Sequence, residues 1–267
     1  MEDTSYLDLR NKTVVKANTL IQNSRFNLSL QQQKILLFLI SQINAYDEQF
    51  KLYEFDLIQF CKYAGIDYDN GKNYIDIKKA IKEIADKSLW VELEEDEETL
   101  LRWIEKPYIN KRQGIIKIRL DEDMKPFLLQ LKANFTSYEI IWTLKFQSKY
   151  SVRMYELAKS LHYNELEIYT RRYPIDELKK LLGAEHYKEY RDFKRKALIP
   201  AIKEVNKYSD KNIVFEEITR GRKVLQIQLY ISTKEAMDRI KIRSDIEHEL
   251  GLTQMTLWDT LEEKGYN

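Results

Sequence analysis

The chain alternates between stretches with helical hydrophobic spacing and stretches in which apolar residues come at every second position. Ser29 followed by Gln32 is a capping-box pattern, and it predicts that the first firm helix begins there. Helical spacing in the first half predicts helices over residues 29–44, 56–64 and 74–87. Strand-like alternation predicts strands over residues 88–93, 100–108 and 115–120.

The second half of the chain repeats this order at an offset of about 120 residues. The sequence Ala-Ile-Lys-Glu-Ile at 80–84 returns as Ala-Ile-Lys-Glu-Val at 201–205. Helices are expected over 151–163, 176–182, 187–206 and 233–250, and strands over 167–173, 213–217 and 224–231. Ser151 opens the first of these helices, and the expected caps of two others are Asp176 and Thr233. Pro200 predicts a kink or a break near Ile199, because proline lacks a backbone donor.

Helices followed by a β-hairpin describe a winged helix, which is a helix-turn-helix variant with a β wing. The predicted fold class is therefore α+β and helix-rich, with two tandem winged-helix domains of pseudo-duplicated topology. We expect an N-terminal domain at 1–132, a C-terminal domain at 133–250 and an unassigned tail at 251–267. Pro126 suits the first turn of a short helix in the joining segment, which has no Gly/Ser-rich linker.

Composition fits two compact domains, and charge distribution is more informative than net charge. The chain carries 44 Lys and Arg against 43 Asp and Glu, a net charge of +1. Bases nevertheless cluster between Lys188 and Lys196 and again at 220–223, whereas acids cluster between Glu92 and Glu98. Such separation favours a polarised molecule with one basic face.

Signals for catalysis, metal binding and membrane insertion are weak. The three histidines are scattered, Cys61 is alone, and no glycine-rich phosphate loop is present. We therefore expect no catalytic residue, no metal, no cofactor and no enzymatic activity. The acidic start resembles no signal peptide and no apolar run could span a bilayer, so a cytoplasmic protein without a membrane partner is expected.

Double-stranded DNA is the predicted partner, because the third helix of a winged helix enters the major groove and arginine can pair with guanine there. Any single charge run is more simply a solvated face, but a basic third helix beside a basic wing turn favours DNA. The predicted contacts in the second unit are Lys188, Arg191, Lys194, Arg195, Lys196, Arg220, Arg222, Lys223, Lys149 and Arg153. In the less basic first unit they are Lys78, Lys79, Lys111 and Arg112.

Three stretches of the chain, at 15–34, 144–157 and 190–206, resemble the initiator Rep family of theta-replicating, often iteron-bearing, bacterial plasmids. The most specific is Tyr-Arg-Asp-Phe-Lys-Arg-Lys-Ala-Leu-Ile-Pro-Ala-Ile-Lys-Glu-Val-Asn at 190–206, and the resemblance covers about residues 14–232. It implies a carboxy-proximal domain that reads repeated origin sites and an amino-proximal domain that adds contacts or dimerises. It also implies monomer–dimer switching and binding of the host initiator and replicative helicase.

The first hypothesis is therefore a plasmid replication initiator that binds origin repeats, distorts and helps open the origin, and represses its own gene. The alternative is a dimeric winged-helix repressor without initiator activity, which would read an inverted repeat. A nicking enzyme and a protein-binding adaptor are two further possibilities. The first lacks a histidine pattern for its metal, and the second predicts no salt-dependent DNA binding.

Overall fold

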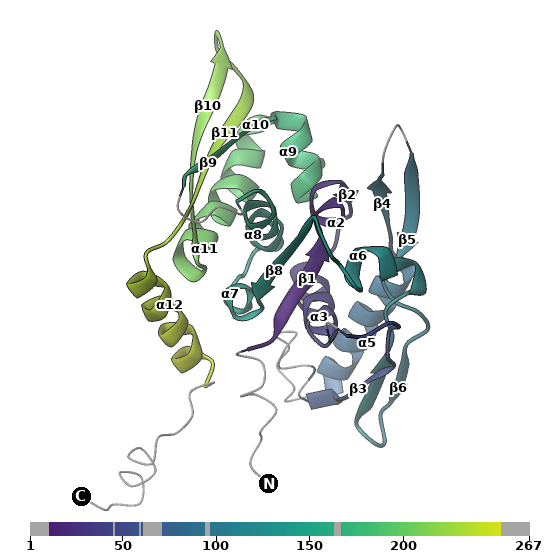
Figure 1. Ribbon diagram of the computed structural model, residues 1–267. Coiled ribbons are helices and arrows are strands. Elements are labelled where there is room, and N and C mark those ends of the chain that lie inside the picture. Colours follow the sequence, from purple (N-terminus) through teal and green to yellow (C-terminus); the bar gives the residue numbers. More distant parts are fainter. Residues whose placement is uncertain are drawn as a thin grey trace, which may run out of the picture.

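The computed structural model describes residues 11–44, 46–58, 60, 71–93, 97–162 and 167–251 (Figure 1). Cys61, most of the helix expected at 56–64, the centre of the acidic run at 94–96 and the tail beyond Gly251 lie outside the described residues.

The first unit places helices beside three small sheets. Its elements are β1 (Thr13–Ala17), α2 (Asn18–Gln22), β2 (Ser24–Arg25), α3 (Leu30–Ile40), β3 (Tyr53–Asp56), α5 (Gly71–Asp86), β4 (Ser88–Glu92), β5 (Glu98–Arg102), β6 (Tyr108–Asn110) and β7 (Ile115–Ile118). The sheet orders are β2-β4-β5 and β3-β7-β6, and β1 pairs with a later strand. All pairings are antiparallel.

Both long helices of this unit form where the hydrophobic spacing predicts them. Ser29 caps α3 by accepting the Gln32 N–H at 3.2 Å, and the Gln32 side chain accepts the Ser29 N–H at 3.0 Å, which confirms the capping box. The helix ends at Ile40, earlier than expected, because the Ser41 hydroxyl turns back onto the Phe38 carbonyl. In α5, Ile77, Ile81 and Ile84 are buried, as their spacing requires.

The single strand expected at 100–108 is wrong, because this segment belongs to two hairpins. β5 ends at Arg102 and pairs with β4, whereas β6 begins at Tyr108 and pairs with β7. Between them, Trp103 and Ile104 are buried in the core. The β4–β5 hairpin directly follows α5, so it holds the position of the wing in this unit.

The joining segment contains the expected short helix and one strand that the pattern did not reveal. After a 3-10 turn, η1 (Glu122–Met124), α6 (Lys125–Leu128) has Pro126 in its first turn, as predicted. β8 (Phe135–Glu139) then pairs with β1, and α7 (Ile141–Leu144) follows. β8 lies beyond the domain boundary expected after residue 132, yet its pairing partner is the first strand of the chain.

The second unit combines a helical cluster with a long β-hairpin. Its elements are α8 (Lys149–Leu161), β9 (Tyr169–Pro174), α9 (Ile175–Leu182), α10 (Tyr190–Phe193), the π-helical turn η2 (Lys194–Leu198), α11 (Ile199–Tyr208), β10 (Lys211–Arg220), β11 (Lys223–Thr233) and α12 (Ala236–Glu249). The sheet order is β10-β11-β9. Figure 1 shows the β10–β11 hairpin projecting beyond the helices at the top of the molecule.

The starts expected for three helices of this unit are wrong, because α8 and α9 begin earlier than expected and α12 begins later. Ser148, rather than Ser151, caps α8 by accepting the Tyr150 N–H at 3.2 Å. The residues at the caps of α9 and α12 are Pro174 and Glu235, and neither caps through its side chain. The C-terminal stop of α9 is confirmed, because Gly183 adopts the left-handed conformation with φ 65°.

The run α10–η2–α11 corresponds to the expected helix three. Pro200 does not break this run, but it makes the run irregular. The helical run continues from Tyr190 to Tyr208, but the five residues before Ile199 form a π-helical turn. In that turn the Ile199 N–H donates to the Lys194 carbonyl, five residues back. A wider turn of this kind accommodates a proline ring that would otherwise collide with the carbonyl one turn earlier.

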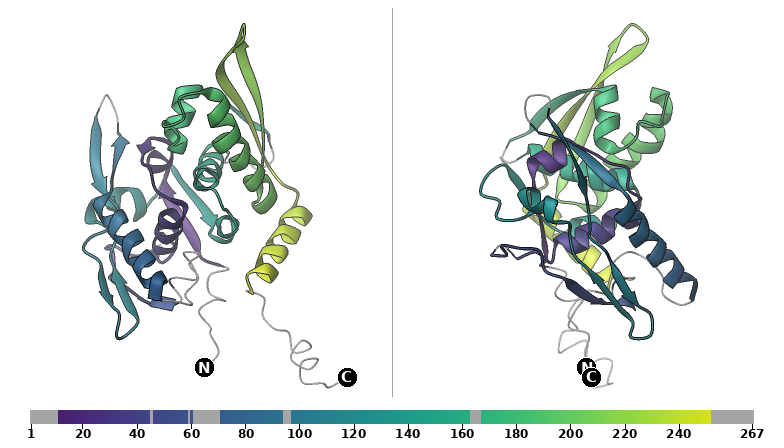
Figure 2. Two further views of the ribbon diagram at one scale, coloured as in Figure 1. Left: turned by 180° about the vertical axis from the view of Figure 1, so that it is seen from behind. Right: turned by 90° about the vertical axis from the view of Figure 1, so that its right-hand side faces the viewer.

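α8 is the element that both units share. It packs against α2, α3 and β8 on one side and against α9, α11 and β10 on the other, and the views of Figure 2 place it in the middle of the molecule. Its charged residues Arg153 and Glu156 are 5% and 1% exposed. A helix whose charged face is buried must find partners for those charges in both neighbouring units.

Glu156 finds its partners in the first unit and the joining segment. One carboxylate oxygen accepts from Lys16 Nζ and from the Tyr138 hydroxyl, each at 2.6 Å. Lys16 lies on β1 and Tyr138 lies on β8, so this contact fixes α8 to the β1–β8 ribbon. Burial raises the pKa of the Glu156 carboxyl, but Lys16 and Arg153 outweigh that effect and hold the pKa below its ordinary value.

Arg153 connects three chain segments through backbone carbonyls. Its guanidinium donates to Leu181 O at 2.9 Å, to Ile21 O at 3.2 Å and to Ser24 O at 3.3 Å. The same group lies over the Phe26 ring at 4.3 Å. The end of α9, the end of α2 and the β2 strand are therefore held together by one buried cation.

We predict that Glu156→Gln destabilises the fold by about 3–5 kcal/mol, because Lys16 and Arg153 would stay buried without a carboxylate. The change in unfolding free energy is measured by urea denaturation at neutral pH. Glu216→Gln is the control, since Glu216 also accepts from a tyrosine, Tyr230 at 2.8 Å, but is exposed. An equal loss in both variants would contradict the role given to Glu156.

The same carboxylate predicts a pH dependence. Because its folded pKa is lowered, its stabilising contribution is complete above the ordinary value of 4.5 and is lost as the pH falls through the folded pKa. The stability difference between wild type and Glu156→Gln should therefore shrink as the pH falls below about 4.5. A difference that stays constant in this range would show that Glu156 is not ionised in the fold.

Gly183→Ala should be destabilising for two separable reasons. A left-handed φ costs roughly 1–2 kcal/mol for a residue with a Cβ, and that Cβ would lie 2.8 Å from Phe26 O in the first unit. Gly221→Ala is the matched control, since its φ is 62° but no atom lies within 4 Å of the added Cβ. Thermal denaturation of both variants should show the larger loss of stability for Gly183→Ala. Equal losses would mean that the two units are not in contact at Gly183.

Candidate nucleic-acid interface

Helix three, which is the run α10–η2–α11, buries one side and exposes the other. Phe193, Ala197, Ala201 and Val205 are fully buried, as the hydrophobic spacing predicts. Arg191, Arg195 and Lys196 are exposed on the outer side. The expected helix began at 187, but α10 begins at Tyr190, so Lys188 lies in the preceding turn, where it is also exposed.

The exposed bases of α10 and η2 differ in how strongly their charges are compensated. Arg195 and Lys196 share the Asp192 carboxylate at 3.2 and 3.4 Å, and these two partners lower the pKa of Asp192. The Arg191 side chain makes no hydrogen bond or ion pair with any residue that the structure describes. Among the bases of α10 and η2, its guanidinium is therefore the one without a compensating carboxylate.

Lys194 has a different environment, because it connects helix three to the wing. Its ammonium lies 2.6 Å from the Glu217 carboxylate on β10 and 5.9 Å from the centre of the Phe215 ring. The Tyr190 hydroxyl donates to the same carboxylate at 2.5 Å. Lys194 and Tyr190 together hold the pKa of Glu217 below its ordinary value. The angle between helix and hairpin is thus set by a half-exposed ionic contact.

The turn of the second hairpin carries the bases predicted for it. Arg220, Arg222 and Lys223 are all exposed, and none of their side chains has a hydrogen-bond or ion-pair partner among the described residues. Gly221 permits the tight turn with φ 62°. A register shift between Ile218 and Thr219 bends the strand just before the turn. Three uncompensated cations therefore stand at the end of a rigid β-ribbon.

The prediction that Arg153 contacts DNA is wrong. Its side chain is 5% exposed and is occupied by the three backbone carbonyls described above. Lys149, at the start of the same helix, is half-buried and donates to Asn27 Oδ1 at 2.7 Å. The sequence could not separate the two, because both are basic residues in the first turns of one amphipathic helix.

The bases predicted in the first unit are all exposed, two in the middle of α5 and two in the β6–β7 turn. Lys78 and Lys79 lie on the outer face of α5, and Lys79 is 3.9 Å from Glu83. Lys111 and Arg112 lie in the β6–β7 turn, and the Lys111 ammonium lies over the Tyr74 ring at 5.1 Å. Because the wing position belongs to β4–β5, these two bases are not at the tip of the first wing.

No arrangement for catalysis or metal binding is found in the described part of the chain. No group of three His, Cys, Asp or Glu side chains there could hold a metal ion.

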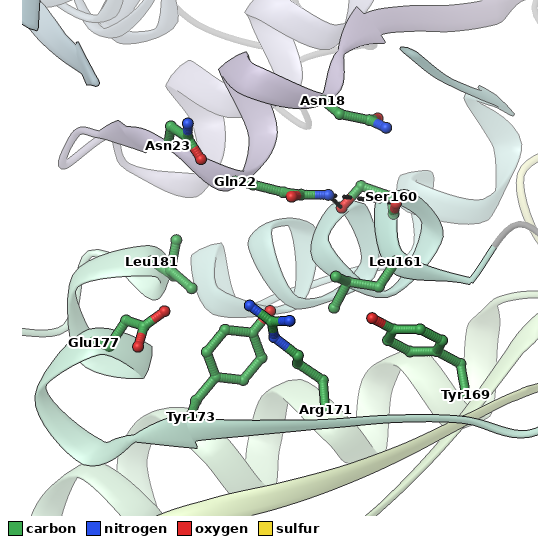
Figure 3. Close-up of a pocket in the computed structure, with 10 residues that line it drawn as sticks. All are labelled: Asn18, Gln22, Asn23, Ser160, Leu161, Tyr169, Arg171, Tyr173, Glu177 and Leu181. Carbon is green, nitrogen blue, oxygen red and sulfur yellow. Dashed lines mark hydrogen bonds between the residues drawn. The ribbon is translucent and has the colours of Figure 1, made fainter. Parts of the chain in front are cut away.

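A polar pocket of about 290 Å³ lies between α2 and the second unit. Figure 3 shows its lining, where Gln22 donates to Ser160 and Arg171 lies beside Tyr173. Among the described helices, none combines the length and the apolar character needed to cross a bilayer.

Comparison with protein families assigns both halves of the chain. Residues 13–159 match the model described as "Initiator Replication protein, WH1", and residues 174–231 match "Initiator Rep protein, WH2". The chain belongs to the initiator Rep family. It is a replication initiator with two winged-helix domains, which confirms the predicted fold class and the predicted role in replication initiation.

Two known proteins resemble this initiator along most of its length. A curated "Replication initiation protein" of Escherichia coli is 26% identical over 235 residues, which cover 85% of this chain and 72% of the relative. A solved structure, "Crystal structure of Pi initiator protein in complex with iteron DNA", matches with a TM-score of 0.67 at 19% identity. That match covers 85% of this chain and 99% of the other, and at this identity it shows the fold.

The sequence reasoning gave no role to the acidic residues that hold the candidate interface in shape. Asp192 and Glu217 each hold two side chains of the basic surface in place. Asp192 could have been found from its spacing of three and four residues to Arg195 and Lys196. Glu217 could not, because its partners lie 23 and 27 residues away along the chain.

Proposed function

We propose that this initiator binds direct repeats in duplex DNA at its replication origin through α10, η2 and the β10–β11 hairpin. The observation that carries the proposal is the exposed Arg191, uncompensated among the described residues, on the third helix of a winged helix beside a basic wing turn. Since such a helix enters the major groove, Arg191 would face base edges. Arg195 lies one turn further along the same face.

The wing and helix three would make different kinds of contact with DNA. Arg220, Arg222 and Lys223 would contact phosphates, which gives affinity without sequence information. Arg191 and Arg195 would contact guanine O6 and N7, which gives specificity. The Lys194–Glu217 contact would keep the two elements at a fixed angle, so that both engage the same duplex.

The first unit would add phosphate contacts through Lys78, Lys79, Lys111 and Arg112. Two units held by one shared helix act at high effective concentration on a single DNA molecule. Bending a DNA site costs on the order of 1–6 kcal/mol, and several simultaneous contacts can offset that cost. The Pi initiator, which shares this fold, was solved in complex with iteron DNA, and this supports repeats as the target.

Family membership also supports the remaining parts of the proposal. The protein would associate with itself, repress its own gene in one oligomeric state and help open the origin in another. It would work in the cytoplasm and bind the host initiator and replicative helicase. A dimeric repressor that reads one inverted repeat is the competing function, and the arrangement of the protected DNA separates the two.

Footprinting on the DNA that flanks its own gene tests the proposal. We expect protection of several short direct repeats in helical phase next to an A·T-rich segment. Protection of a single inverted repeat over the promoter would favour the repressor. Absence of protection at moderate salt, for protein that is folded by circular dichroism, would contradict DNA reading by the second unit.

Arg191→Ala should weaken binding to the protected repeat by roughly 1–3 kcal/mol and leave binding to scrambled duplex nearly unchanged. Arg222→Ala should instead weaken both by the same factor and reduce the salt slope by about 1. Fluorescence anisotropy at several salt concentrations measures both effects. Arg102→Ala, an exposed arginine on β5, is the control and should change neither. Equal losses on both duplexes for Arg191→Ala would mean that Arg191 contacts only phosphate.

A further inference from the structure

An open groove of about 580 Å³ runs along the seam between the two units. Its lining comes from the start of α3 (Asn27, Ser29), the residue that follows α5 (Lys87), the start of α8 (Lys149) and helix three (Lys196, Pro200). We call it the seam groove. It is the place where three lysines from separate parts of the chain come together.

The ammonium groups in the seam groove have few anionic partners. Lys87 donates to the amide oxygen of Gln32 at 2.8 Å, and Lys149 donates to the amide oxygen of Asn27 at 2.7 Å. Both acceptors are neutral. Lys196 lies 3.4 Å from Asp192, but that carboxylate also holds Arg195. The groove therefore keeps a net positive charge.

The other carboxylates near the groove do not remove this charge. Glu204 accepts the backbone N–H groups of Gln147 and Ser148 at 3.0 and 3.1 Å, so it serves the start of α8. Glu185 is exposed and attracts Lys149 through space. Burial first, and the repulsion by Lys87 second, lower the pKa of Lys149, which is consistent with two cations held close together.

The seam groove lies beside helix three, on a different side from the wing. Lys194 turns toward Glu217 and Phe215 of the wing, whereas Lys196 lies 5.8 Å from the centre of the Tyr187 ring and lines the groove. A helix in the major groove has a phosphate backbone on either side, because the groove is only about 12 Å wide. With helix three in a major groove, the wing would flank one backbone and the seam groove would flank the other.

We propose that the seam groove binds the sugar-phosphate backbone of the same duplex that helix three reads, with Lys87, Lys149 and Lys196 on its phosphates. This inference rests on the proposed function and adds Lys87, a residue of the first unit, to the DNA contacts. Bound phosphate offsets the repulsion between cations of different units. DNA therefore stabilises the relative placement of the two units, and does not merely occupy both.

Duplex DNA fits this groove better than a small anion does. The groove is open and continuous with the exposed face of helix three through Lys196, as an extended backbone requires. A free phosphate would need a closed set of donors, and the polar lining here is spread over four chain segments.

The test compares Lys87→Met/Lys149→Met with wild type in two assays. In anisotropy titrations, the affinity for repeat and scrambled duplex should fall by the same factor, and the salt slope should decrease by about 1–2. In ethylation-interference mapping on the repeat, the phosphates on one flank of the recognised major groove should lose their effect. Guanine N7 protection by helix three should persist. An unchanged slope together with an unchanged phosphate pattern would overturn the proposal.

Two matched variants complete the design. Lys87→Arg/Lys149→Arg keeps both charges and should retain the wild-type salt slope, whereas Lys132→Met, an exposed lysine outside the groove, should change nothing. Inorganic phosphate provides the competing arm. If millimolar phosphate raises the melting temperature of wild type but not of the Met variant, while duplex binding is equal in both, the groove holds a free anion and the proposal is wrong. If the wild-type protein does not protect guanine N7 through helix three, the proposed function itself is contradicted.

Discussion

The arrangement of the whole molecule depends on one buried charge cluster in the middle of α8. Arg153 and Glu156 cannot be left without partners in the interior, since each uncompensated charge would cost several kcal/mol. Glu156 is satisfied by β1 and β8, and Arg153 by the ends of α2 and α9 and by β2. The relative position of the two winged-helix units is therefore fixed by ionic geometry and not by a linker. The family models meet near the end of this helix, at residues 159 and 174.

Helix three shows how a single element serves both packing and binding. Its inner residues are small or aromatic and lie fully buried, and the π-helical turn before Pro200 keeps the run continuous. The three consecutive bases at 194–196 point to different surroundings: the wing, the solvent and the seam groove. Successive residues of a helical run point in different directions around its axis, so neighbouring bases meet different surroundings.

A β-hairpin follows α5 in the first unit and helix three in the second, and the two hairpins carry opposite charges. The hairpin after helix three of the second unit ends in Arg220, Arg222 and Lys223, whereas the hairpin after α5 carries Glu92, Glu97 and Glu98. Only a basic wing is suited to a phosphate backbone. The first unit therefore has to approach DNA through other surfaces, such as Lys87 or the β6–β7 turn, and the duplicated topology does not imply duplicated function.

Local sequence patterns were enough for the fold class, most of the helices, and the basic character of helix three and its wing. These features are local, because hydrophobic periodicity, the Ser29–Gln32 capping box and the clustering of bases all act within a few residues. Tertiary structure alone decided that β8 pairs with β1, that Arg153 is buried and Arg191 exposed, and that Lys87 meets Lys149 and Lys196. The reason is physical: burial and pairing depend on neighbours that lie tens to more than a hundred residues away, and no pattern within one helix or strand records them.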